Sequence, residues 1–76
     1  MIPQIIQAKY VEDYKVWLAF KDGVKGEVDL RFELDGEIFE PLKDISYFRT
    51  FTLKGHTLSW ENGADFAPEF LRESLR

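Results

Sequence analysis

The stretch Tyr14-Lys15-Val16-Trp17-Leu18-Ala19-Phe20, followed closely by Asp22-Gly23, decides the fold of this chain. Every second side chain from Val16 to Phe20 is apolar and shares one face, while Trp17 lies on the other face. This alternation predicts a half-buried strand. Asp-Gly suits a type I′ turn, in which both central residues have positive φ, so we expect a β-hairpin here.

Further strands are predicted on both sides of this central strand in the sequence. The return strand is predicted over residues 24–29, with Val24 and Val28 facing inward. Gly26 falls on the same inward face, where it marks either a bulge or a place where a ring covers the backbone. A first strand is predicted over residues 5–10, because its start is apolar and rich in β-favouring residues.

The middle of the chain gives weaker signals. Apolar residues alternate between residues 30 and 36, which fits either a strand or one irregular helical turn. Residues 39–42 predict an extended connector, because Pro41 biases the preceding residue away from helix. Asp44 is a suitable cap for a short helix over residues 44–48.

A second hairpin and a final helix follow. We expect strands over residues 49–53, with Phe51 and Leu53 inward, and over residues 57–60. The last helix should begin near Ala67-Pro68, since proline is favoured at the first helical position. The prediction is therefore an α+β domain: an antiparallel β-sheet of about five short strands in β-hairpins, with a short middle helix and a C-terminal helix packed on the sheet.

Size and composition support a single domain over residues 1–76. Aromatic residues make up 16% of the chain, and each large ring buries roughly 150–250 Å² when enclosed, so few residues can close a core. The rings expected to contribute are Trp17, Phe20, Phe32, Phe39, Phe48, Phe51, Trp60, Phe66 and Phe70.

The chain has no cysteine, which is typical of a reducing compartment. No apolar run approaches the ~20 residues that span a bilayer, and the start lacks a basic, apolar leader pattern. We therefore expect a cytoplasmic protein without a membrane partner. The net charge of −4 and the scattered basic residues argue against direct nucleic-acid binding and favour a basic partner.

No residue pattern predicts catalysis or cofactor binding. His56, the single histidine, falls in a predicted turn with no nucleophile motif beside it, so we interpret it as a solvated turn residue. One histidine without cysteine cannot supply the ligands of a zinc site. The five glycines are spread out and form no phosphate loop. We expect a protein that is not an enzyme and has no cofactor or metal.

Four residues form the candidate interaction patch: Trp17, Trp60, Asn62 and Asp65. Trp17 marks an interaction surface if its face is open to solvent, and belongs to the core if the final helix covers it. Trp60, Asn62 and Asp65 are candidates for polar–aromatic recognition. The structural interpretation is that Asn62-Gly63 forms a turn with positive φ and that Asp65 helps to start the final helix.

Several stretches carry a resemblance to a known family. They are Val16-Trp17-Leu18-Ala19-Phe20 with Asp22-Gly23, Gly26-Glu27-Val28-Asp29-Leu30, Phe39-Glu40-Pro41-Leu42-Lys43-Asp44 with Tyr47-Phe48, and Leu58-Ser59-Trp60-Glu61-Asn62-Gly63-Ala64-Asp65 with Pro68 and Leu71. The chain resembles domain of unknown function 2442, a family of short bacterial proteins, from about Ile5 to Leu75. The last stretch is the most specific.

The resemblance implies an α+β fold with an antiparallel sheet and no established activity. Some longer relatives carry a helix-turn-helix domain after this module, and we expect this chain to act without one. Family members are often encoded beside another small protein, as in toxin–antitoxin pairs. The resulting hypothesis is a non-enzymatic protein-interaction module, the antitoxin-like member of a two-gene pair, or a homodimer. The alternative is a small ligand-sensing domain that binds a small molecule.

Overall fold

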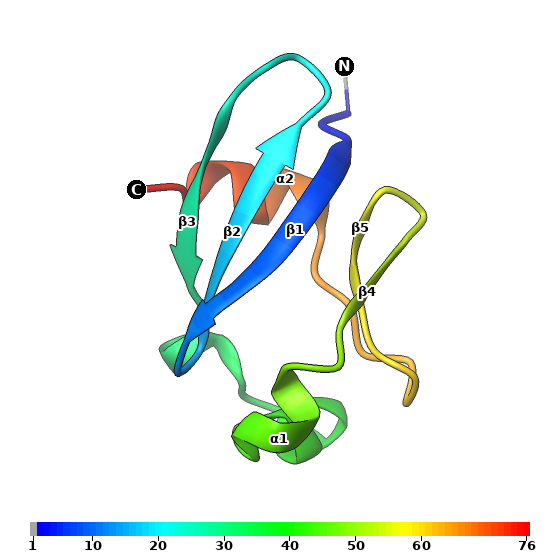
Figure 1. The fold of residues 1–76 in the computed structure, drawn as a ribbon. Coiled ribbons are helices and arrows are strands. Elements are labelled where there is room, and N and C mark those ends of the chain that lie inside the picture. Colours follow the sequence, from blue (N-terminus) through cyan, green and yellow to red (C-terminus); the bar gives the residue numbers. More distant parts are fainter. Residues whose placement is uncertain (1) are drawn as a thin grey trace.

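The computed structural model describes residues 2–76, and only Met1 of the predicted single domain lies outside them (Figure 1). Three antiparallel strands form the larger sheet in the order β1-β2-β3: β1 (Ile5–Glu12), β2 (Lys15–Phe20) and β3 (Lys25–Asp29). The alternating stretch is its central strand. The predicted strands here are confirmed, because each has one apolar face to bury.

The β2–β3 turn differs in type from the prediction. Gly23 has a φ of 92°, whereas Asp22 is not among the residues with positive φ. The amide of Gly23 donates to the Phe20 oxygen at 3.0 Å, and the amide of Phe20 donates to the Val24 oxygen at 2.8 Å. These bonds define a type I turn closed by a glycine bulge, which needs a left-handed residue only at Gly23.

A separate two-stranded ribbon contains β4 (Thr52–Lys54) and β5 (Thr57–Ser59). The five strands therefore divide between two sheets. The predicted second hairpin is present, but its first strand begins at Thr52 and not at residue 49, because the chain is still turning after the middle helix. The inward position predicted for Leu53 was wrong, since this residue is 38% exposed. The amide of Ile5 donates to the backbone oxygen of His56 at 2.9 Å and joins the ribbon to β1.

Helical turns connect the two sheets. They are the 3₁₀ segments η1 (Arg31–Glu33) and η2 (Glu37–Lys43) and the short helix α1 (Ile45–Phe48). The extended connector predicted at residues 39–42 was wrong: the fixed φ of Pro41, near −65°, also suits a 3₁₀ turn. The predicted cap is confirmed, since the Asp44 carboxylate accepts the Ser46 amide at 3.0 Å.

The last helix, α2 (Pro68–Glu73), lies behind the three-stranded sheet in Figure 1, with proline in its first turn as predicted. The fold is thus α+β. Between the elements lies one core of buried apolar residues: Ile5, Val16, Leu18, Phe20, Val28, Leu30, Leu34, Leu42, Phe48, Leu58, Trp60, Ala64, Phe66 and Leu71. Phe32, predicted to help close this core, is instead 83% exposed.

Candidate functional site

The two faces of the three-stranded sheet have different surroundings. Gly26 pairs directly with Leu18, and a Cβ at Gly26 would lie 2.9 Å from the backbone oxygen of Arg76. The Arg72 guanidinium lies 5.2 Å from the centre of the Phe20 ring. Residues on and after α2 therefore cover the inner face. Because side chains alternate along a strand, Trp17 projects from the opposite face.

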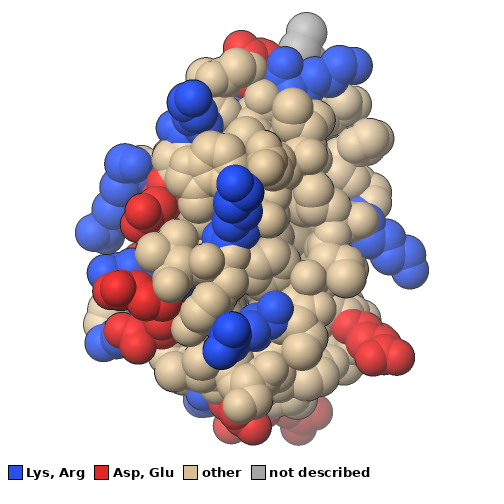
Figure 2. All heavy atoms as spheres, viewed as in Figure 1, with Lys and Arg blue, Asp and Glu red and all other residues tan. Residues whose placement is uncertain are grey.

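Trp17 occupies the middle of this outer face, where it is half-buried. It pairs with Lys9 of β1 on one side and with Glu27 of β3 on the other. The Lys9 ammonium lies 5.5 Å from the centre of the indole ring, a cation–π contact that leaves the charge on the surface. In Figure 2 this side of the molecule is largely uncharged, with isolated basic side chains standing on it.

Two register shifts in β1 add apolar groups to the exposed surface. They lie between Ile5 and Gln7 and between Tyr10 and Glu12, so that Ile6 and Val11 interrupt the alternation. Both Ile6 and Val11 are exposed. No local pattern predicted these bulges, because a bulge depends on the pairing partner as well as on the strand itself.

Trp60 lies in the core and not on the surface. It is 3% exposed, and its indole N–H donates to the backbone oxygen of Phe48 at 2.9 Å. Its ring also packs against Phe51 and Phe66. Trp17 and Trp60 therefore do not share an exposed patch.

Asn62 stabilises the turn that follows Trp60 through hydrogen bonds of its side chain. Its Oδ1 accepts the Ala64 amide at 3.0 Å, and its Nδ2 donates to the Ile38 oxygen at 2.9 Å. Gly63 has the predicted positive φ, 95°. The Asn62 side chain thus ties this turn to η2, a contact that its position in the sequence did not reveal.

Asp65 does not start the final helix. Ala67 occupies the cap position of α2, and no side chain accepts a hydrogen bond there. Asp65 instead forms an isolated backbone bridge with Ser59 of β5. The predicted cap was wrong because the chain stays extended through Ala67, so that α2 begins only at Pro68.

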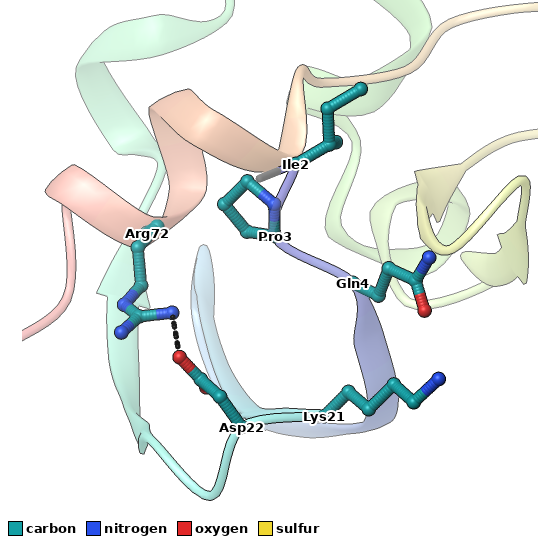
Figure 3. A pocket seen from close by; sticks show the side chains of 6 residues that line it. All are labelled: Ile2, Pro3, Gln4, Lys21, Asp22 and Arg72. Carbon is teal, nitrogen blue, oxygen red and sulfur yellow. Dashed lines mark ion pairs between the residues drawn. The ribbon is translucent and has the colours of Figure 1, made fainter.

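The surface of residues 2–76 is hollowed in several places. One open hollow of about 710 Å³ is lined by Ile2, Pro3, Gln4, Lys21, Asp22 and Arg72. Figure 3 shows Asp22 and Arg72 pointing toward one another, with 3.0 Å between Asp22 Oδ2 and Arg72 Nη1. A second hollow of about 660 Å³ lies against the β4–β5 ribbon and has both Trp60 and Asp65 in its lining. Three separate segments build the first hollow, so no local motif could have revealed it.

Two exposed charged groups have shifted pKa values, and one of them, Asp22, lies in the first hollow. The Val24 amide donates to the Asp22 carboxylate and, with Arg72, lowers the pKa of Asp22 below its ordinary value of 3.8. At the other end of the molecule, a hydrogen bond to Glu40 and its negative charge raise the pKa of Lys43. Both groups are exposed, and neither shift brings a group into the range of acid–base catalysis at neutral pH.

His56 occupies the β4–β5 turn, where the backbone needs a residue that adopts positive φ. His56 and Gly55 have φ values of 64° and 63°, which is the type I′ pattern, and the His56 side chain is exposed. Histidine tolerates this left-handed region better than most residues. Across residues 2–76, no three His, Asp or Glu side chains are grouped so that they could hold a metal ion.

Comparison with known proteins places the chain in a family. A family model described as protein of unknown function, DUF2442, matches residues 5–76. The chain belongs to the DUF2442 family. Neither the search of curated proteins nor that of solved structures returned a match. Among the described residues, no helix of this DUF2442 protein is long and apolar enough to cross a membrane.

Proposed function

We propose that this DUF2442 protein is a non-enzymatic interaction module that binds a second protein through the outer face of its three-stranded sheet. The observation that carries the proposal is the position of Trp17, at the centre of a sheet face that α2 leaves open. Tryptophan is strongly enriched among the residues that dominate protein–protein binding energy.

The surroundings of Trp17 support this role. Ala19 is its small neighbour two residues along the strand, so one side of the indole ring can be approached by a partner side chain. Lys9 and Glu27 flank the ring across the strands and provide a polar rim. Such an arrangement, with an aromatic anchor inside a polar border, is typical of a binding surface.

The partner would be a second small protein in the cytoplasm, with this chain as the antitoxin-like member of a two-gene pair. The lack of any cysteine and the family's gene arrangement motivate that part of the proposal. Nucleic acid is disfavoured as a direct ligand because the net charge is −4.

The first experiment is gentle purification of tagged protein from its native host, with the mass of the complex measured under non-denaturing conditions. We expect a stoichiometric second protein that is lost from Trp17→Ala and retained by Leu53→Ala, which removes an exposed apolar group from the other sheet. Circular dichroism should show both variants folded. Recovery of the protein alone, or a partner held equally by Trp17→Ala, would refute the proposal.

A small-ligand sensor is the second candidate, and the hollow beside α2 favours it. Its lining combines the apolar Ile2 and Pro3 with the charged Asp22 and Arg72, which is the composition expected of a ligand site. The test is a thermal-shift screen with metabolite-sized compounds. A ligand for this hollow should stabilise the wild type and fail to stabilise Arg72→Gln.

A further inference from the structure

Phe32 is the most exposed large apolar side chain of residues 2–76. The residues that flank η1 explain its orientation: Leu30 and Leu34 are both buried, so the helical turn between them directs Phe32 away from the core. One exposed apolar residue needs no explanation by itself. The charge around Phe32 makes this position unusual.

The chain's net charge is concentrated around η1 and η2. Residues 29–44 contain two of the ten basic residues and six of the 14 acidic ones, so this segment carries −4 and the rest of the chain is neutral. The acidic residues are Asp29, Glu33, Asp35, Glu37, Glu40 and Asp44. In Figure 2 most of the visible acidic side chains gather at the left and lower margins, whereas the basic ones are scattered.

Both basic residues of this segment are already engaged. Arg31 pairs with Asp13 at 3.3 Å, and Lys43 pairs with Glu40 at 2.7 Å. Five carboxylates of the segment then form no ion pair within residues 2–76. Asp29 and Asp44 accept the backbone amides of Arg31 and Ser46. The other three, Glu33, Asp35 and Glu37, are exposed.

The chain itself limits the distance between these carboxylates and Phe32. Glu33 adjoins Phe32 in the chain, and Glu37 is five residues away, so their Cα atoms cannot be more than about 18 Å apart. A side chain that packs on Phe32 therefore enters a region of negative potential, which a basic partner lowers in energy and an acidic one raises.

We propose that residues 29–44 form a docking surface for a basic segment of another protein, with aliphatic side chains packed on Phe32 and Lys or Arg facing Glu33, Asp35 and Glu37. The inference goes beyond the proposed function, because this surface is formed by residues 29–44 and not by the sheet face around Trp17. A nucleic acid or an anionic membrane would be repelled by this charge, and so would the same surface of a second copy.

The test uses a library of random 12-residue peptides, selected on the immobilised full chain. We expect the enriched peptides to contain more Lys and Arg than Asp and Glu, together with Leu, Ile or Met. For synthetic copies of these peptides, Phe32→Ala should weaken binding about tenfold or more, the effect of losing a central anchor. Binding to the wild type should fall as salt increases.

Two matched triple variants distinguish the effect of the local charge around Phe32 on peptide binding from the effect of the total charge of the chain. The triple variant Glu33→Gln, Asp35→Asn, Glu37→Gln should weaken binding and flatten its salt dependence. The control triple Glu61→Gln, Glu69→Gln, Glu73→Gln removes the same charge elsewhere and should bind like the wild type. Equal effects of the two triples would overturn the proposal.

Other outcomes distinguish this inference from the proposed function. Enriched peptides without net positive charge, peptides that bind Phe32→Ala normally, or a library without enrichment would each overturn the inference. Peptides that are lost on Trp17→Ala but retained by Phe32→Ala would overturn it while supporting binding at the sheet face. Because Phe32 is exposed, its variant should remain folded, which circular dichroism checks.

Discussion

The indole N–H of Trp60 donates a 2.9 Å hydrogen bond to the backbone oxygen of Phe48, the last residue of α1. The two rings also contact one another, with their centres 5.7 Å apart. Both residues are buried, so this pair joins the middle helix to the end of the β4–β5 ribbon inside the core. The burial and hydrogen bond of Trp60 thus give it a structural role.

The two tryptophans should differ strongly in their contribution to stability. Trp60→Phe removes core volume and leaves the Phe48 oxygen without its buried donor, so we expect a loss of about 2–3 kcal/mol in the free energy of unfolding. Trp17→Phe should change it by less than about 0.5 kcal/mol, as surface substitutions do. Urea denaturation measures both, and equal losses would contradict the burial of Trp60.

Gly26 should tolerate no side chain while the end of the chain stays in place. In Gly26→Ala the new methyl would lie 2.9 Å from the Arg76 oxygen, so backbone must move. We expect a loss of about 1–3 kcal/mol, typical of overpacking. The Arg76 amide, which donates to the Glu27 oxygen at 2.9 Å, should exchange faster with solvent.

A double-mutant cycle isolates this contact. Deletion of Leu75 and Arg76 removes the obstacle, so Gly26→Ala should lower the free energy of unfolding clearly less in the shortened chain than in the full chain. If the loss of stability is the same in both chains, the substitution acts through the strand itself and not through the covering segment.

Asn62 should stabilise the turn through its side chain. Asn62→Ala removes the bonds to the Ala64 amide and the Ile38 oxygen, and we expect a loss of about 1–2 kcal/mol. Its neighbour Glu61 is exposed and serves as the control, with Glu61→Ala expected within about 0.5 kcal/mol of the wild type. Thermal and urea unfolding should agree, and indistinguishable variants would refute this role.

Asp22 should make stability depend on pH. Its pKa is lowered in the folded state, so the unfolded chain takes up the proton first and the folded state is stabilised above pH 3.8. As pH falls through the lowered pKa, that stabilisation disappears. The difference in unfolding free energy between wild type and Asp22→Asn should therefore be largest near neutral pH and should disappear in acid.

A second variant identifies the cause of the shift. Arg72→Gln removes one of the groups that lower the pKa of Asp22, so an NMR titration should find that pKa closer to 3.8. Added salt should reduce the Arg72 contribution, because exposed charges are screened. A pKa for Asp22 unchanged by Arg72→Gln would assign the shift to backbone amides, chiefly that of Val24.

Local signals predicted an element well where the pattern of apolar side chains and the capping or turn residues indicated the same type of structure. The alternation around Val16 predicted the central strand, and Asp44 and Pro68 predicted where the helices begin. Apart from the turn type at Asp22-Gly23 and the cap assigned to Asp65, the errors lie in residues 30–53. There Leu34, just after η1, and Leu42, within η2, are buried without a regular period. Periodicity cannot detect burial in irregular segments.

The candidate site was less predictable than the fold. Sequence reasoning chose both tryptophans but could not tell the surface residue Trp17 from the core residue Trp60. The difference depends on which sheet face α2 covers, and that contact joins residues far apart in the chain. The charged residues of the hollow, Asp22 and Arg72, were not selected for the same reason.

By itself the sequence determined the α+β class, the hairpins and the net charge, because alternation, glycine turns and composition act over a few neighbouring residues. Only the tertiary structure decided the division into two sheets, the outward position of Phe32 and the close approach of Arg76 to Gly26. Those features depend on packing between distant segments, where burying one apolar residue determines which of its neighbours is left exposed to solvent.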